Sequence, residues 1–158
     1  MLKQAEITAT LKSIPWFLEL SSESIERLAA IAEIHAFDHD DVIFSEGEQH
    51  PFIYILLEGE VLLESFIPGH GTLPIFTAES LDVIGWSSLT PVVRQKTSTA
   101  RVMKRAVLLT FQADQLMKIC ETDCDLGFII MRRLANIVAS RMLNHRLHLM
   151  RLITIQNE

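Results

Sequence analysis

The chain is organised around residues 83–91, VIGWSSLTP, in which an apolar approach typical of a strand ends at a glycine. Gly85 allows the backbone to turn sharply or to approach a ligand closely. Ser87 and Ser88 suit the first turn of a short helix, whose free N–H groups attract anions, and the cations Arg94 and Lys96 follow within a few residues. This order predicts a phosphate cradle, although it also fits an ordinary tight connection between two elements.

Length and composition are those of one well-buried globular domain, with 158 residues of which 49% are hydrophobic and 22% charged. The two cysteines, Cys120 and Cys124, are too few for a disulfide framework, which favours a reducing compartment. No basic and apolar leader opens the chain, and no apolar run approaches the roughly 18 residues that span a bilayer. We therefore expect a cytoplasmic protein that makes no membrane contact.

Charge is distributed unevenly along the chain, whose net charge is −6. Residues 1–93 contain three Lys or Arg against fifteen Asp or Glu, a net of −12, whereas residues 94–158 contain eleven against five, a net of +6. The basic part most simply complements the acidic part, within one protomer or across a dimer. We expect no direct contact with nucleic acid, because the acidic part would repel phosphate.

The predicted elements change from helices to strands near residue 34. A short amphipathic helix over residues 2–12 is interrupted around Pro15, and Ser21 or Ser22 can cap a second helix over residues 24–34. Closely spaced short strands follow and predict an α+β, mainly β fold, with a small barrel or jelly roll after the helices. The predicted strands are 34–38, 42–44, 52–58, 60–67, 72–77, 96–103 and 106–111.

The chain becomes helical again after Phe111. Residues 114–120 form a predicted brief helix, and Asp123 or Asp125 can cap a last helix that continues to about Leu152. One apolar stripe recurs every three or four residues along this helix, as in a coiled-coil seam, and a second stripe accompanies its first half only. The seam consists of Phe128, Met131, Ala135, Val138, Met142, His145, Leu149 and Leu152, and the second stripe of Leu126, Ile130, Leu134 and Ile137.

The seam extends beyond the expected reach of the barrel, so we expect a second copy of the chain to cover it. Arg141, Arg146 and Arg151 are expected to keep the other faces of the second half solvated. The predicted assembly is a parallel two-fold homodimer through residues 128–152. The domain is expected to span residues 1–152, with helices at 2–34, a barrel at 34–111 and C-terminal helices at 113–152, followed by a tail at 153–158.

This order of elements resembles the cyclic-nucleotide-binding domain of the catabolite activator and Fnr superfamily, and the resemblance covers residues 12–152. The stretch 41–48, DVIFSEGE, is similar to the family's strand and glycine turn, 53–61, IYILLEGEV, to its next hairpin, and residues 81–89 to the start of its phosphate-binding cassette. Two stretches, 85–89, GWSSL, and 131–135, MRRLA, most resemble small stand-alone bacterial members.

The resemblance also implies which residues meet the ligand. In nucleotide-responsive members the cassette glycine precedes a glutamate that holds the ribose hydroxyl, whereas this chain has Trp86 there. The family's cassette arginine, which pairs with the cyclic phosphate, aligns with Lys96, and a lysine lacks the two-pronged contact of a guanidinium. Thr97 and Ser98 still offer donors at the same end of the cassette. These departures argue against ordinary cyclic AMP sensing and favour a different small anion or nucleotide-like molecule.

The long helix carries the other implied contacts. Relatives use it to touch the base of the nucleotide near the position of His145, which Asn144 and Arg146 flank; alternatively, His145 is a polar residue that sets the register of the seam. Transcription factors of the family continue beyond this helix into a helix-turn-helix module, whereas this chain ends at Glu158. We therefore expect that it does not read DNA in that way and that its signal leaves through dimerisation or a separate effector protein.

Metal sites provide a rival interpretation, because small barrels also resemble cupins, which bind metals through His and Glu. His35 and His39 are four residues apart, and His50 and His70 lie in turns, but the cupin pattern of His-x-His followed by Glu is missing. The two cysteines lack the number for an iron cluster and suit buried packing.

Catalytic signatures are missing from the sequence, which has no placed Ser-His-Asp order, no paired carboxylates in the cassette and no P-loop. The preferred interpretation is a non-enzymatic sensor, whose ligand is held by Lys96 or Arg94 and by the N–H groups from Trp86 to Leu89. That ligand, a cyclic nucleotide or another small anion, is the only cofactor considered. One alternative is a degenerate domain with a closed pocket that serves as an interaction module. A further alternative is a cupin-like metal-dependent enzyme.

Overall fold

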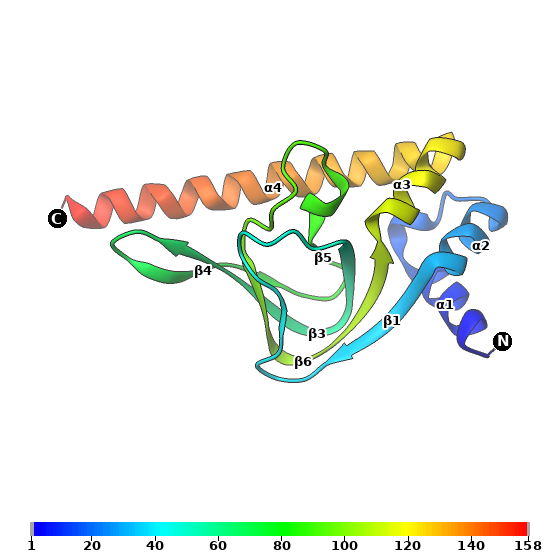
Figure 1. Ribbon diagram of the computed structural model, residues 1–158, viewed down its shortest axis with the longest axis horizontal. Coiled ribbons are helices and arrows are strands. Elements are labelled where there is room, and N and C mark those ends of the chain that lie inside the picture. Colours follow the sequence, from blue (N-terminus) through cyan, green and yellow to red (C-terminus); the bar gives the residue numbers. More distant parts are fainter. Residues whose placement is uncertain (1, 158) are drawn as a thin grey trace.

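Six strands form one antiparallel sheet in the computed structural model, which describes residues 2–157 (Figure 1). The strands are β1 (Ala32–Phe37), β2 (Val42–Phe44), β3 (Phe52–Ile67), β4 (Gly71–Ala78), β5 (Val83–Ile84) and β6 (Thr99–Gln112). The helices are α1 (Leu2–Ser13), α2 (Ser22–Ile31), α3 (Ala113–Thr122) and α4 (Cys124–Gln156), with the 3₁₀ turns η1 (Pro15–Phe17) and η2 (Trp86–Leu89).

The expected fold class is confirmed, because a mainly antiparallel sheet lies between N-terminal helices and a long C-terminal helix. Figure 1 shows α4 running along the whole length of the molecule, with α1, α2 and α3 gathered at one end. Met1 and Glu158, the outer ends of the predicted domain and tail, lie outside the described residues.

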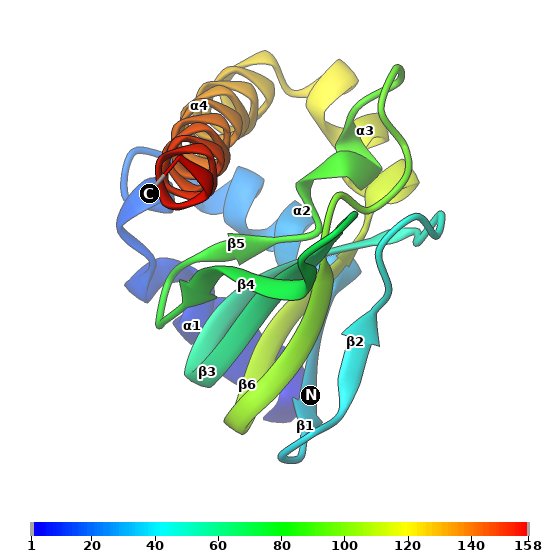
Figure 2. The same cartoon turned by 90° about the vertical axis from the view of Figure 1, so that its left-hand side faces the viewer.

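The sheet is built on β3 and β6, which pair along most of their length. Its main path is β1-β6-β3-β4, while β2 also pairs with β6, and β5 with β3. Figure 2 views α4 from its C-terminal end and shows the strands curling below that helix. Because of this curvature, β4 also contacts α4.

Both long strands pass through positions at which the sequence predicts a break. β3 continues through Gly59, and β6 through Lys104 and Arg105. Gly59 has a φ of +94°, and a Cβ there would lie 2.2 Å from the carbonyl oxygen of Arg105, so only glycine fits. The pairing register shifts at this level, which marks a bulge that bends the strands without ending them. The four predicted strands at 52–58, 60–67, 96–103 and 106–111 are therefore two.

Apolar side chains are buried in two groups. One group, which includes Leu28 and Leu126, fills the space between the helices and the sheet, and the other lies inside the curled sheet around Val61. Successive residues of β3 alternate between the two groups, since Ile55 belongs to the first and Leu56 to the second. This part of β3 is consequently buried on both faces.

The second helix is capped as the sequence predicts but is shifted along the chain. Ser21 is the N-cap of α2, and its hydroxyl oxygen accepts a hydrogen bond from the Ser24 N–H at 3.1 Å. The predicted end at residue 34 is wrong, because Ala32 already pairs with Phe111 in the sheet.

The long helix α4 begins at a cap on Asp123. This carboxylate accepts hydrogen bonds from the Leu126 N–H at 3.1 Å and from the Ser24 hydroxyl at 2.5 Å, which joins α4 to α2. The helix continues to Gln156, beyond the predicted end at residue 152, and its second half exposes apolar side chains such as Met142. Among residues 2–157, no helix is both long enough and apolar enough to cross a bilayer.

Candidate functional site

The cassette of this chain, residues 83–98, runs from β5 to the start of β6 and contains the turn that the sequence marks with a glycine. Gly85 has a φ of +78°, in the left-handed region, and directs the chain from β5 into η2. A Cβ at this position would lie 2.9 Å from the Phe52 carbonyl oxygen and 3.4 Å from Lys96 Nζ. Both conformation and space therefore require glycine here.

Lys96 is the central side chain of the cassette and is only 2% exposed. Its Nζ donates to the Gly85 carbonyl oxygen at 3.0 Å and to Ser88 Oγ at 2.8 Å, and lies 5.2 Å from the centre of the Phe44 ring. Burial lowers the pKa of Lys96 to about 8, and the negative charge of Glu48 offsets this shift only in part. The ammonium group thus holds the cassette together and stays mostly charged at neutral pH.

A second buried cation reaches the cassette from α4. Arg141 is 8% exposed, its Nη2 donates to the Val83 carbonyl oxygen at 2.9 Å, and its guanidinium carbon lies 3.6 Å from the centre of the Phe76 ring. Burial lowers the pKa of Arg141, and Asp82 opposes this shift, but a guanidinium remains charged in proteins. Its Nε is buried without a hydrogen-bond partner.

The prediction that Arg141 is solvated is wrong, and the sequence contained a signal for its burial. Arg141 continues the second apolar stripe of the helix by one more turn, four residues after Ile137. A position on that stripe faces the body of the same chain, whatever its side chain. Earlier members of the stripe are Leu126, Ile130, Leu134 and Ile137.

Both cations line one small cavity with a volume of about 20 Å³. Such a volume holds about one water molecule or a small monovalent anion. Ser87, which is 1% exposed, also lines the cavity, and its Oγ has no hydrogen-bond partner. His145 of α4 forms another part of the wall.

Neither cation has a carboxylate partner within residues 2–157, because the ion pairs found there involve other Lys and Arg residues. The pKa of His145 is lowered by burial, and further by His148 and Arg141. An imidazole carries no negative charge, protonated or not, so His145 does not neutralise the two cations. Unpaired buried charges cost several kcal/mol, so the cavity has an electrostatic preference for an anion.

The predicted site residues divide into those that line the cavity and those that lie elsewhere. Ser88 and Arg94 line an outer groove of about 380 Å³, and Leu89 belongs to the apolar core. Asn144 and Arg146 contribute nothing to the cavity wall. The predicted residues that line the cavity are Gly85, Trp86, Ser87, Lys96, Thr97, Ser98 and His145.

The histidines considered as metal ligands have other neighbours. His35 Nδ1 lies 3.0 Å from Thr110 Oγ1, and His50 Nε2 lies 2.7 Å from the Tyr54 hydroxyl oxygen. In the part of the chain that the structure describes, no three His, Cys, Asp or Glu side chains gather as a metal site would require. Burial raises the pKa of the Cys120 thiol to about 11.

Comparison with known proteins finds one matching family model and a set of solved structures with a similar fold. The family model described as cyclic nucleotide-binding domain matches residues 34–123. A solved structure from Geobacter metallireducens GS-15, described as that of a candidate cyclic nucleotide-binding protein, is 26% identical, with a TM-score of 0.73 over 85% of this chain and 97% of the other. No curated protein is similar enough in sequence to count as a match.

Two further structures share the fold at lower identity. A cyclic nucleotide-binding domain from Methylobacillus flagellatus KT is 21% identical, with a TM-score of 0.73 over 88% of this chain and 78% of the other. The sensor domain of the transcriptional regulator DNR from Pseudomonas aeruginosa is 18% identical, with a TM-score of 0.73 over 90% of this chain and 95% of the other.

Proposed function

Because the chain belongs to the cyclic nucleotide-binding domain family, we propose that it is a regulatory domain that senses a small monovalent anion in place of a cyclic nucleotide. The anion occupies the cavity between the cassette and α4. The observation that carries this proposal is the pair of buried cations, Lys96 and Arg141, that line this cavity without a carboxylate partner among residues 2–157.

The size of the cavity supports an inorganic ligand over a nucleotide. Pockets for small organic ligands measure about 300–1,000 Å³, whereas this cavity measures about 20 Å³. A cyclic nucleotide would have to displace Trp86 or one of the two cations, which already bond to the Gly85 and Val83 carbonyl oxygens. A chloride-sized anion needs no such rearrangement.

The donors in the wall suit such an anion. Ser87 Oγ and Arg141 Nε are both buried without a partner, and each unsatisfied group costs about 1–3 kcal/mol. An anion that accepts from both would satisfy them and would neutralise charge at the same time. Lys96 would contribute mainly its positive charge, since its Nζ already donates to Gly85 and Ser88.

The ligand would couple to α4 through the residues that this helix contributes. Arg141 and His145 both belong to α4 and both line the cavity. An anion that accepts from Arg141 Nε places a negative charge beside the same guanidinium that donates to the Val83 carbonyl oxygen through Nη2, and so changes how strongly α4 is held on β5.

The signal would leave through the exposed side of α4. Phe128, Met142 and Leu149 of the predicted seam are exposed apolar side chains, and a second copy of the chain would bury them in a parallel two-fold dimer through residues 128–152. A separate effector protein is the other proposed recipient of the signal. Sedimentation at micromolar concentration tests the dimer, which a monomer would refute. The proposed compartment is the cytoplasm, where the free thiols of Cys120 and Cys124 stay reduced.

A second candidate function is a scaffold with a permanently closed pocket. The hydrogen bonds that Lys96 and Arg141 already make favour this function, because these side chains bind cassette atoms in place of an external ligand. Both candidates are non-enzymatic functions.

Thermal-shift and calorimetric titrations at constant ionic strength separate these candidates. Chloride, nitrate, phosphate, cyclic AMP and cyclic GMP are each added against a background of gluconate, which is too bulky for the cavity. We expect chloride or nitrate to raise the melting temperature, and Lys96→Met to abolish the effect, while Lys104→Met, which changes an exposed ion pair with Glu60, retains it. A flat response to every ligand supports the scaffold, and binding of a cyclic nucleotide overturns the proposal.

A further inference from the structure

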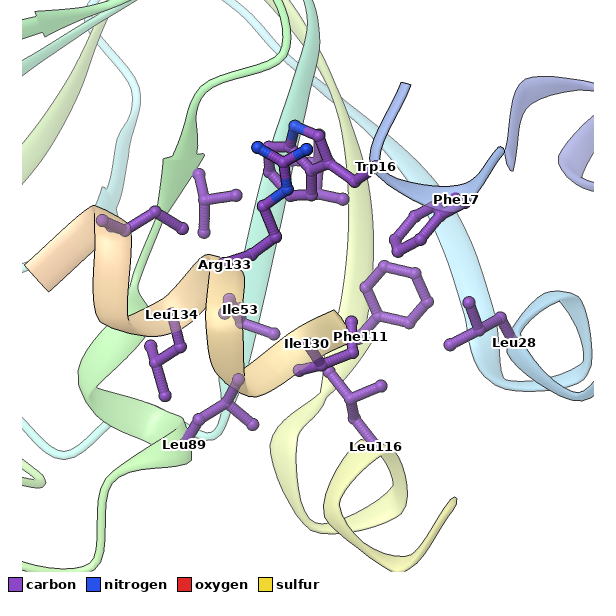
Figure 3. A pocket seen from close by; sticks show the side chains of 13 residues that line it. Trp16, Phe17, Leu28, Ile53, Leu89, Phe111, Leu116, Ile130, Arg133 and Leu134 are labelled. Carbon is purple, nitrogen blue, oxygen red and sulfur yellow. The ribbon is translucent and has the colours of Figure 1, made fainter. Parts of the chain in front are cut away.

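We propose a second ligand site, for a short-chain aliphatic carboxylate, in an apolar cavity between the first half of α4 and the body of the domain (Figure 3). This site is separate from the proposed anion site: the wall of this cavity contains neither Lys96 nor Arg141.

The cavity has a volume of about 30 Å³ and an almost wholly apolar wall. Phe17 of η1, Leu28 of α2, Ile53 of β3, Phe111 of β6 and Leu134 of α4 all contribute to it. A volume of this size holds roughly two water-sized groups, yet these side chains offer water no hydrogen bonds. An aliphatic tail of two or three carbons suits such a space better than water does.

One charged group lies in this wall, and it comes from α4. The Arg133 guanidinium carbon lies 5.4 Å from the centre of the Trp16 ring, and Nε is buried without a hydrogen-bond partner. Figure 3 shows the guanidinium against the indole of Trp16 at one end of the cavity, away from Leu116 and Leu28 at the other. The cavity therefore has a cationic end and an apolar end.

This polarity defines the class of ligand. A carboxylate can accept from Nε and from a terminal nitrogen of the same guanidinium, which is the two-pronged geometry that arginine favours. Arg133 is only partly buried, so the carboxylate would stay close to solvent while the tail enters the cavity. Chains of about three or four carbons, namely propionate and butyrate, match the space of roughly two water-sized groups. An inorganic anion would leave the apolar end empty, and a neutral amide would lose the charge interaction.

A ligand in this site would contact both α4 and the cassette. Ile130, Arg133, Leu134 and Ile137 of α4 form one side of the cavity, and Leu89, the last residue of η2, forms part of another. Ser87, two residues earlier in the same turn, lines the anion cavity. A carboxylate would thus act on the element that also holds the anion.

The test compares matched ligands on matched variants. Melting temperatures and ligand saturation-transfer NMR are recorded for butyrate, butanamide, acetate and octanoate at constant ionic strength in saturating chloride. The variants are Arg133→Gln, Arg133→Lys and, as the control, Arg132→Gln, because Arg132 is exposed on the same helix and lies over Phe128.

We expect butyrate to bind the wild-type chain and the Arg132→Gln variant alike, and to bind the Arg133→Gln variant at least tenfold more weakly. Arg133→Lys retains the charge and loses the two-pronged contact of the guanidinium, so it should bind butyrate with intermediate affinity. This variant replaces Arg133→Gln in the test if Arg133→Gln does not fold. Butanamide should not bind. The proposal is overturned if butyrate does not bind, or if it binds Arg133→Gln as well as it binds the wild-type chain. It is also overturned if butanamide binds, or if acetate and octanoate bind as well as butyrate.

Discussion

Raising the pH should stabilise this protein through Lys96, and the gain should vanish in the variant Lys96→Met. Burial lowers the pKa of Lys96 in the folded chain to about 8, whereas its ordinary value is 10.5. Between these values the unfolded state binds more protons than the folded state, so the free energy of unfolding rises with pH. The difference between the two values, at about 1.4 kcal/mol for each pKa unit, amounts to about 3 kcal/mol.

Two other buried groups titrate in an overlapping range with the opposite sign. Burial raises the pKa of Cys120 to about 11 and that of Tyr54 to about 12. The stability that these neutral groups contribute is present below their ordinary pKa values of 9.0 and 10.0 and is lost as the pH rises through the raised values. The effect of Lys96 must therefore be taken as a difference between two chains that both retain Cys120 and Tyr54.

Urea unfolding of the wild-type chain and of Lys96→Met, followed by tryptophan fluorescence, provides this difference. In gluconate, we measure the difference between the free energies of unfolding of the wild-type chain and the variant. We expect this difference to shift by about 3 kcal/mol in favour of the wild-type chain between about pH 7 and about pH 10.5. Methionine removes the hydrogen bonds to Gly85 and Ser88, but that loss is independent of pH in this range. In chloride the gain should be smaller, because a bound anion favours the charged ammonium. Parallel pH profiles in gluconate would refute the reasoning.

Three further substitutions test the turn, the cap and the exposed seam. In urea unfolding, Gly85→Ala should lower the free energy of unfolding by more than the roughly 1–2 kcal/mol cost of a left-handed residue. Gly47 also has a left-handed φ, +83°, but lies in open space, so Gly47→Ala should show that cost alone. Asp123→Ala should cost about 1 kcal/mol in thermal melts followed by circular dichroism. Since the Ser24 hydroxyl lowers the pKa of Asp123, this difference should be complete above about pH 4 and should shrink as the pH falls through the lowered value; a difference that stays constant down to full protonation would contradict it. Met142→Glu should yield monomers in sedimentation, whereas Leu18→Glu, at another exposed apolar position, should not; a dimer of Met142→Glu would exclude the seam.

The order of elements could be predicted from the sequence because it depends on local signals. Each of these signals lies within a few residues of the element that it determines. They are the alternation in β3, the caps at Ser21 and Asp123, and the turn at Gly85. The strand breaks at Gly59 and at Lys104–Arg105 were wrong for a non-local reason. These two segments lie opposite each other in the sheet, so that together they form one bulge, and a single sequence does not reveal that two turn signals will face each other.

The sequence points directly to the glycine and the lysine of the candidate site, whereas its second cation was missed although Arg141 continues the second apolar stripe of the helix. Lys96 follows the turn closely in the chain, whereas Arg141 arrives from α4, 45 residues later. An arginine after four apolar members of a stripe is usually the point at which a helix becomes solvated. Here Phe76 and the Val83 carbonyl oxygen, both supplied by the curled sheet, give the guanidinium a stacking surface and an acceptor.

The second half of α4 would convert a small rotation of the helix at Arg141 into a larger displacement of its C-terminal end. Arg141 fastens the helix to β5, and about 15 residues, or roughly 22 Å of helix, extend from that point to Gln156. A rotation of about 5° at Arg141 would move the far end by about 2 Å, although nothing at the cavity itself would shift by more than a fraction of that distance. At that end Gln156 Nε2 lies 3.0 Å from His70 Nε2, in the turn between β3 and β4. A displacement of this size would separate the two groups, so that an ion bound at the proposed site would break a contact at the far end of α4.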